Sequence, residues 1–314
     1  MPGKIIILCP FYNDSASLTL LLKEFDERLG SSKNNHFSFL IINDGSSETL
    51  QAKTGNNYDI NILHLQRNLG HQKAICIGLA YIKDNLKCDK VLIMDCDGED
   101  RPEDAIKLID ASASQPDKII FGKRQSRTEN SHFIFFYFLY KFLFKLLIGR
   151  TISFGHFLIM PYSILEKIVY YSEIWNHVVG GIIKSGLPYT TIETHRGKRY
   201  AGTSKMNFTA LFLHGFGAIA VFIDRITVRL LFFSIITITF SLLSILAIFA
   251  IRTFTDLAIP GWASTLASLL LIVLLQGFLL SLFTMFLYLS SQSQRKFIPA
   301  YHYKDYTGNF ETIK

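Results

Sequence analysis

Two long stretches without a charged residue near the C-terminus most constrain how this chain can fold. Leu230–Ile251 follows Arg229 directly, and Trp262–Leu289 comes after a short loop. A helix rises about 1.5 Å per residue, so the first stretch would be roughly 30 Å long, enough to cross a bilayer core. Uncharged stretches of this length favour membrane spans over buried helices of a soluble core. We therefore predict transmembrane helices at 230–251 and 262–290, joined as a hairpin.

The composition and the charge distribution agree with a membrane protein. Of the 314 residues, 49% are hydrophobic and only 18% are charged. Basic residues stand before the first span and after the second, at Arg225, Arg229, Arg295 and Lys296. Because Lys and Arg are retained on the cytoplasmic side of spans, we expect a multi-pass protein of the cell inner (cytoplasmic) membrane with its main domain and both termini in the cytoplasm. We expect the lipid bilayer, and no nucleic acid, as a partner.

The first part of the chain, up to about Gly122, alternates short β-branched runs with stretches of helical periodicity. The predicted strands are Ile5–Cys9, Phe39–Ile42, Ile62–Leu65, Val91–Met94 and Lys118–Phe121, and the predicted helices are Ser17–Leu29, Gln72–Ile82 and Glu103–Ala111. This alternation is typical of a parallel sheet covered by helices. We predict an α/β fold with a Rossmann-like, mostly parallel sheet.

Polar residues follow four of these strands at the point where each strand ends. They are Tyr12-Asn13-Asp14, Asn43-Asp44-Gly45-Ser46, Arg67-Asn68-Leu69-Gly70 and Asp95-Cys96-Asp97. In open α/β sheets, ligands bind outside the carboxyl ends of the strands. Asp95 and Asp97 are two residues apart, so both side chains can address one cation in an extended chain. The pattern favours a ligand site, although polar turns that only connect a sheet to its helices would look the same.

Aromatic residues become frequent beyond Gly122. Ser131–Ile148 combines them with Lys141 and Lys145, which are four residues apart and share one helical face. Asn207–Ile226 is a similar apolar segment that leads into the first span. Both segments resemble helices that lie in a membrane interface, and a core helix is the alternative for the first.

Five segments share their order and spacing with the motifs of a known family. They are Cys9-Pro10-Phe11-Tyr12-Asn13-Asp14, Ile42-Asn43-Asp44-Gly45-Ser46-Ser47, Arg67-Asn68-Leu69-Gly70 with Lys73, Asp95-Cys96-Asp97 with Asp100, Pro102 and Glu103, and Arg199-Tyr200-Ala201-Gly202-Thr203-Ser204-Lys205. In these segments the chain resembles the GT-A, family 2 glycosyltransferases, of the branch with dolichyl-phosphate mannose synthase and bacterial polyprenyl-phosphate (bactoprenol) glycosyltransferases. The match spans nearly the whole chain, because a hairpin of two spans follows the last motif in several bacterial members.

The resemblance implies a division of the chain. Residues 1–125 would form a nucleotide-sugar-binding GT-A half, and 126–206 an acceptor and catalytic half with an interfacial helix. Residues 207–229 would form a juxtamembrane amphipathic helix, and 291–314 a cytoplasmic tail after the two spans.

The resemblance also implies roles for single residues. Those that would bind the donor are Pro10, Tyr12, Asp14, Asp44, Lys73 and Asp95. Asp95 and Asp97 would hold Mg²⁺ or Mn²⁺, hard ions that favour carboxylate and phosphate oxygens. Such an ion stabilises the negative charge that develops on the leaving diphosphate. Arg199 and Lys205 would grip phosphates of the donor or of a lipid acceptor in charge-assisted contacts.

The chain departs from these relatives at Phe154-Gly155-His156-Phe157-Leu158. Relatives carry G-D-F-R there, with an aspartate proposed as the general base, so His156 stands in for that aspartate and Leu158 for the arginine. A neutral histidine can accept a proton near neutral pH. A histidinium could instead attract an acceptor phosphate, which needs no base because it is already an oxyanion. His156 could also be a packed turn residue.

Together these features predict a metal-dependent, inverting hexosyltransferase that is anchored in a membrane. It would move a sugar from a nucleotide sugar, with a UDP-sugar favoured, to polyprenyl (undecaprenyl) phosphate on the cytoplasmic face, as a step of cell-envelope synthesis. One alternative is transfer to a hydroxyl of a lipid-linked saccharide, which would require a base such as His156. Another is a non-catalytic scaffold that retains the fold. A homo-oligomer is compatible with the sequence.

Overall fold

The computed structural model describes residues 3–29, 35–48, 58–124, 145–149, 154–201, 215–255, 261–294 and 296–313. The chain forms two compact units, which are described one at a time. The first comprises Met1–Tyr137, Thr151–Val221 and Lys296–Lys314, and the second comprises Phe138–Arg150 and Phe222–Arg295. The first unit therefore contains chain from before and after the two long apolar stretches.

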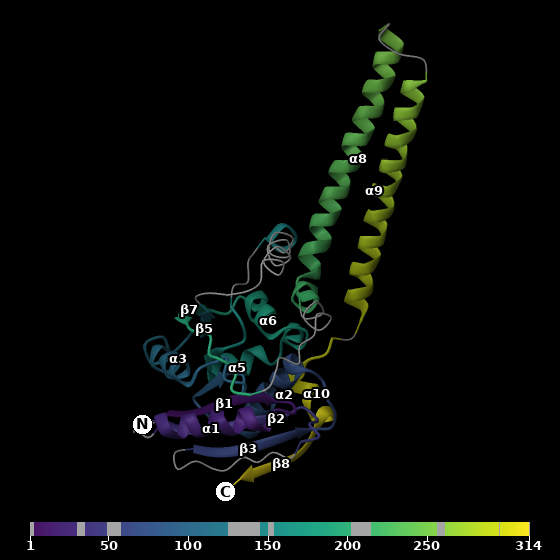
Figure 1. Ribbon diagram of the computed structural model, residues 1–314. Coiled ribbons are helices and arrows are strands. Elements are labelled where there is room, and N and C mark those ends of the chain that lie inside the picture. Colours follow the sequence, from purple (N-terminus) through teal and green to yellow (C-terminus); the bar gives the residue numbers. More distant parts are fainter. Residues whose placement is uncertain are drawn as a thin grey trace. The chain divides into compact units, whose positions relative to one another are not determined.

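A mostly parallel sheet forms the centre of the first unit (Figure 1). Its described strands are β1 (Gly3–Phe11), β2 (Asn35–Asn43), β3 (Tyr58–Leu65), β4 (Lys90–Ile93), β5 (Ile119–Arg124), β6 (Leu158–Pro161), β7 (Tyr189–Thr194) and β8 (Thr307–Ile313). These eight strands have the order β7-β5-β6-β4-β1-β2-β3-β8. Strand β1 pairs in parallel with β2 and β4, and β2 pairs in parallel with β3. Strand β6 runs antiparallel to β4 and β5, while β7 is parallel to β5. The predicted fold class is confirmed.

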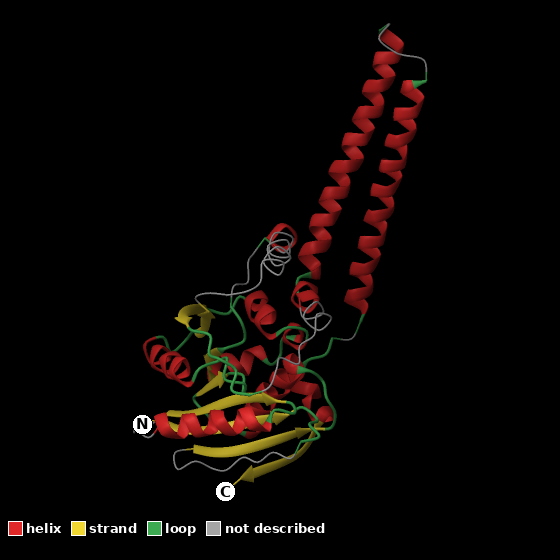
Figure 2. Cartoon of the chain, in the orientation of Figure 1, coloured by secondary structure: helices red, strands yellow, loops and turns green. Residues whose placement is uncertain are grey.

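Helices pack against this sheet because its central strands are buried on both faces (Figure 2). They are α1 (Ser15–Leu29), α2 (His71–Asn85), α3 (Pro102–Ser114), α5 (Tyr162–Ile168) and α6 (Val178–Ser185), with the short 3-10 helix η1 (Ser172–Trp175). Helices α1 and α3 share a core with Ile5 and Ile7 of β1. Helix α2 lies over the side chain of Leu8, where a Cβ added at Gly78 would be 2.5 Å from Leu8 Cδ1. Gly78 therefore allows α2 to approach the sheet closely.

Two long helices, α8 (Ile223–Phe254) and α9 (Trp262–Ser293), pack along one another in the second unit (Figure 1). Each has 32 residues and a mean hydropathy of 2.5 in its most apolar window, which is long and apolar enough to cross a membrane. Several buried residues of the two helices are small or hydroxylated, such as Ser234, Ser241 and Gly277. Small residues let apolar helices approach closely, and the Cβ position of Gly277 is 3.1 Å from Ile238 Cγ1. The predicted spans 230–251 and 262–290 lie inside these helices.

The C-terminal segment folds back onto the first unit. Helix α10 (Pro299–His302) and the 3-10 helix η2 (Tyr303–Tyr306) lead into β8, which pairs antiparallel with β3 and extends that side of the sheet. The buried Tyr303 accepts a hydrogen bond from Asn85 Nδ2 at 3.0 Å. The hairpin is therefore an insertion in the chain between two parts of the first unit.

The two segments predicted to lie in a membrane interface fall partly outside the described residues. Of Ser131–Ile148, only 145–148 is described, and it is helical. Of Asn207–Ile226, only 215–226 is described, with helix at 215–220 and from 223 onward. Their interfacial role stays a prediction.

Candidate functional site

The candidate site lies at the carboxyl ends of β4, β1, β2 and β3, which are neighbouring parallel strands. Each strand is followed by a polar turn, so the turns that carry Asp14, Asp44, Gly70 and Asp95 meet at one edge of the sheet. The loop after β7 reaches the same edge, where Tyr200 N donates a hydrogen bond to the backbone carbonyl of Asp97 at 2.9 Å. The structure thus brings segments from across the first unit to one place.

Arg199 connects two of the predicted carboxylates. Its Nη2 atom lies 2.7 Å from Asp14 Oδ2, and its Nη1 atom lies 3.1 Å from Asp97 Oδ2. Asp97 also accepts a hydrogen bond from the Glu99 amide at 2.9 Å. Burial and the charge of Asp95 raise the pKa of Asp97 to about 6, and the Glu99 amide and Arg199 only partly oppose this rise. The site therefore holds more negative charge near Asp97 than Arg199 neutralises.

Two glycines allow the loop that carries Arg199 to lie directly on the acidic turn. Gly98 has φ +88°, and a Cβ there would be 2.5 Å from the ring of Tyr200. A Cβ at Gly197 would be 2.1 Å from the carbonyl oxygen of Gly98. Any larger side chain at either position would push the loop away from the carboxylates. The glycines therefore help to set where Arg199 lies.

Asp44 organises the turn that precedes α2. This side chain is 3% exposed, and its two oxygens accept hydrogen bonds from Leu69 N at 2.7 Å and Gly70 N at 2.9 Å. Burial raises the pKa of Asp44, and the two backbone donors work against that rise. Gly70 has φ +90° as the residue before α2, a conformation that favours glycine. In the structure Asp44 thus supports a loop; its predicted contact with the donor stays a prediction.

Replacing Asp44 by alanine is expected to lower the free energy of unfolding by about 1–3 kcal/mol, because the partly buried amides of Leu69 and Gly70 lose a charged acceptor. Asp59→Ala is the matched control, since that aspartate is exposed on β3. Thermal unfolding of both purified variants in detergent measures the difference. Equal stability of Asp44→Ala and Asp59→Ala would contradict the supporting role.

The other residues predicted to bind the donor are placed differently from one another. Pro10 is buried within β1, and Tyr12 is 43% exposed just after it. Lys73, on the first turn of α2, holds its Nζ atom 5.2 Å from the centre of the Trp175 ring. Lys205 lies outside the described residues. Donor contacts by these four residues stay predictions.

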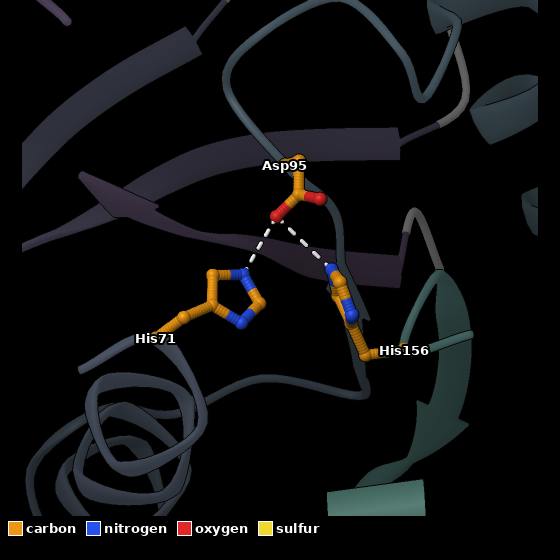
Figure 3. Close-up of side chains that lie close together, drawn as sticks. All are labelled: His71, Asp95 and His156. Atoms are coloured by element: carbon orange, nitrogen blue, oxygen red, sulfur yellow. Dashed lines mark hydrogen bonds and ion pairs between the residues drawn. The ribbon is translucent and has the colours of Figure 1, made fainter. Parts of the chain in front are cut away.

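A second cluster surrounds Asp95 (Figure 3). His71 Nε2 lies 2.7 Å and His156 Nε2 lies 3.0 Å from the same carboxylate oxygen, Oδ1 of Asp95. The two imidazole rings meet edge to face, with centres 4.4 Å apart. His71 donates a directed hydrogen bond, whereas His156 Nε2 is at ion-pair distance but is buried and makes no well-aligned hydrogen bond. Of the two aspartates predicted to bind a cation together, Asp95 therefore contacts two histidines, whereas Asp97 contacts Arg199.

The charges of this cluster support one another. Burial raises the pKa of Asp95, but His156 and His71 outweigh that effect and hold this pKa well below its usual range. Burial lowers the pKa of His156, but Asp95 outweighs it and the net shift is upward. Among the described residues, these three alone bring three potential metal-ligand atoms within 4.8 Å of one another. Asp97 is not part of that group, and a cation shared by both aspartates stays a prediction.

Asp100 and Arg124 form an ion pair that binds the backbone of Asp95. Asp95 N donates to Asp100 Oδ2 at 3.0 Å, and Arg124 Nη2 donates to Asp100 Oδ1, also at 3.0 Å. Asp100 is 2% exposed, and burial together with the charge of Asp95 raises its pKa. The ion pair between the buried Asp100 and the partly exposed Arg124 therefore fixes the backbone of the acidic turn.

Sequence reasoning missed His71 and Arg124 as parts of the site. His71 directly follows the Arg67–Gly70 segment and opens α2, which was a usable signal, because the first residue of a helix after a strand-end turn lies at the ligand-binding edge. Arg124 ends β5, and nothing local in the sequence connects it with Asp100. Only the neighbouring positions of the two residues in the fold do so.

Comparisons with known proteins agree on a family and a fold. The family model described as glycosyl transferase family 2 matches residues 6–170. The chain is 25% identical over 279 residues to the uncharacterized glycosyltransferase YkcC of Bacillus subtilis, covering 84% of this chain and 82% of that protein. It is 26% identical over 286 residues to the uncharacterized glycosyltransferase sll0501 of Synechocystis sp., covering 86% and 85%.

A solved structure with a similar fold is glucosyl-3-phosphoglycerate synthase from Mycobacterium tuberculosis, in complex with Mn²⁺, UDP-glucose and phosphoglyceric acid. The TM-score is 0.50 at 13% identity, and the match covers 71% of this chain and 80% of that one. This similarity supports the fold described above. The narrower resemblance to the dolichyl-phosphate mannose synthase branch stays a prediction.

Proposed function

Because this chain belongs to glycosyl transferase family 2, we propose that it moves a sugar from a UDP-sugar to polyprenyl phosphate at the cytoplasmic face of a membrane. The observation that carries the proposal is the cluster of Asp14, Asp97 and Arg199 at the carboxyl ends of parallel strands. The two apolar helices of the second unit supply the membrane part of the argument.

The charges of the cluster suit a nucleoside diphosphate that arrives with a cation. Arg199 has a guanidinium that can grip diphosphate oxygens in charge-assisted contacts. In the structure it contacts Asp14 and Asp97. When a diphosphate binds the guanidinium of Arg199, a metal cation would take the place of the guanidinium beside Asp97. Asp14 would then be free to accept hydrogen bonds from the base or ribose of the donor.

A divalent cation, Mg²⁺ or Mn²⁺, fits the residues present. Asp95 and Asp97 offer carboxylate oxygens, the ligands that both ions accept, and Arg199 is the cation that lies beside Asp97 in the structure. When bound, the cation would stabilise negative charge on the departing nucleoside diphosphate. The Mycobacterium tuberculosis enzyme was solved with Mn²⁺ and a UDP-sugar, which supports the choice of donor and of metal.

The acceptor half of the proposal rests on the apolar helices and on the chemistry of phosphate. A polyprenyl phosphate stays in the bilayer, and helices α8 and α9 would hold the enzyme there. A phosphate oxygen of the acceptor would attack the anomeric carbon while the bond from that carbon to UDP breaks, which inverts the configuration. This oxygen is already anionic near neutral pH, so the reaction needs no proton acceptor. His156, which contacts Asp95, would then not be needed as a base.

A donor-by-acceptor assay on the full-length protein in detergent, with Mn²⁺ or Mg²⁺, tests this function. Radiolabelled UDP-sugars are offered with undecaprenyl phosphate, with undecaprenol as the matched acceptor without phosphate, and with a lipid-linked saccharide. We expect label to enter the lipid fraction only with undecaprenyl phosphate. Transfer only to the saccharide would contradict the proposed acceptor, and no transfer from any nucleotide sugar would contradict the enzyme function. In sealed inside-out vesicles, transfer from added donor tests the cytoplasmic face.

A further inference from the structure

His71, Asp95 and His156 have the geometry of a metal site that differs from a pair of aspartates. Their ligand atoms lie within 4.8 Å of one another, with both imidazole nitrogens at 2.7 and 3.0 Å from one carboxylate oxygen. Around an ion with bonds of about 2.0–2.2 Å, neighbouring ligand atoms are roughly 3 Å apart. Figure 3 shows the two rings on either side of Asp95, with a nitrogen of each directed at that oxygen. Small side-chain rotations would open room for a cation between them.

The three side chains come from positions that the fold holds in place. His71 opens α2, whose preceding turn is bound by Asp44 through two backbone amides. The amide of Asp95 is bound by Asp100. His156 is next to Phe157, whose carbonyl accepts a hydrogen bond from the amide of β5 residue Gly122 at 2.9 Å.

His156 supplies an independent observation. Its Nε2 atom is buried and lacks a well-aligned hydrogen bond, although it lies 3.0 Å from Asp95 Oδ1. Buried polar atoms are rarely left without a partner, and such an atom needs an explanation. An imidazolium would lose its proton when a metal binds, and a metal bond along the Nε2 lone pair would then provide that partner.

We propose that His71, Asp95 and His156 bind a first-row transition-metal dication, of the Mn²⁺, Co²⁺ and Zn²⁺ class, through two imidazole nitrogens and one carboxylate oxygen. Imidazole suits such ions, whereas Mg²⁺ and Ca²⁺ favour oxygen ligands alone. Three protein ligands leave further coordination positions open for water or for phosphate oxygens. Because its three ligands all come from the protein, the ion would bind without any nucleotide. Only its use in catalysis rests on the proposed function; the binding itself does not.

Metal titration of the full-length protein in detergent, without nucleotide, tests the site. We expect one Co²⁺ or Mn²⁺ to bind with an affinity at least tenfold higher than that of Mg²⁺, because two of three ligands are imidazoles. His71→Ala and His156→Ala should each weaken Co²⁺ binding by about tenfold or more. His36→Ala is the matched control, since that histidine is exposed at the start of β2 and should leave the affinity unchanged. Equal affinities in all four proteins, or equal binding of Mg²⁺ and Co²⁺, would overturn the proposal.

Pulsed electron paramagnetic resonance of the Mn²⁺-loaded wild type needs no variant, so it remains decisive if a substitution prevents folding. Coupling to nitrogen-14 of imidazole is expected, and a spectrum of oxygen ligands alone would overturn the proposal. The outcomes are separable from those of the transferase assay. Sugar transfer without nitrogen ligation would leave the proposed function standing and remove this site. Nitrogen ligation without sugar transfer to any acceptor would support this metal site and contradict the proposed function.

Discussion

Replacing Asp97 by asparagine is expected to reduce sugar transfer by about 10²- to 10³-fold, the scale of losing one group that stabilises charge in a transition state. Asparagine keeps the size of the side chain and an oxygen that can accept the Glu99 amide, which lies at 2.9 Å. It removes the negative charge that faces Arg199 and that would hold a cation. Initial rates at saturating donor, with the acceptor that the wild type uses, measure the effect.

The Asp97→Asn variant should fold normally. Burial and Asp95 already disfavour the charged carboxylate at this position, as its raised pKa of about 6 shows. A neutral side chain should therefore not lower the melting temperature in the metal-free protein at neutral pH. Asp110→Asn, on the exposed face of α3, is the matched control and should keep wild-type activity. Full activity of Asp97→Asn in folded protein would refute its role at the cation.

The second large effect is expected for Arg199→Ala. This substitution removes the guanidinium that contacts Asp14 at 2.7 Å and Asp97 at 3.1 Å. Both carboxylates then lose their positively charged side-chain partner. Hydrogen bonds between charged groups contribute about 1.5–3 kcal/mol each, so we expect kcat/KM to fall by about 10²-fold or more. Calorimetric titration with UDP should show a matching loss of affinity, since the guanidinium is proposed to grip the diphosphate.

Two further variants separate charge from geometry. Arg199→Lys keeps the positive charge but cannot contact two groups with one planar fork, so it should recover only part of the activity. Arg196→Ala removes an arginine from the same loop, one that is 43% exposed and pairs with Glu99. An exposed ion pair contributes little, at most about 1 kcal/mol, so this control should change activity by only a few fold. Similar losses in Arg196→Ala and Arg199→Ala would show that the loop matters and that the bridging contact does not.

Much of the fold could be predicted because it depends on local patterns. The run Ile5–Cys9 became the centre of β1, since continuous apolar runs are buried on both faces of a parallel sheet. Of the predicted strand Val91–Met94, the first three residues lie in β4, which begins one residue earlier at Lys90 and ends at Ile93. The uncharged stretches became α8 and α9 for a similar reason, because helical length and hydropathy can be read from a few turns of chain. Strand β8 was missed, since its polar residues carry no such pattern and its place depends on pairing with β3.

The candidate site divides in the same way. Asp14, Asp44 and Asp95 could be expected at one edge because parallel strands end there together. Which group each carboxylate faces could not be expected. Asp97 meets Arg199 from 102 residues away, whereas Asp95 turns to His71 and His156. These pairings depend on how the loop after β7, which carries Arg199, and the segment before β6, which carries His156, are placed over the strand ends.

The sequence by itself determined the parallel sheet, the polar strand ends and the two long apolar helices, because each follows from periodicity and composition within about 30 residues or fewer. Only the tertiary structure decided that the acidic pair is divided between two environments, an arginine at Asp97 and two histidines at Asp95. It also decided that the chain completes its sheet after the hairpin. The physical reason is the same in each case: contacts between distant segments are set by packing of the whole unit, which no local pattern records.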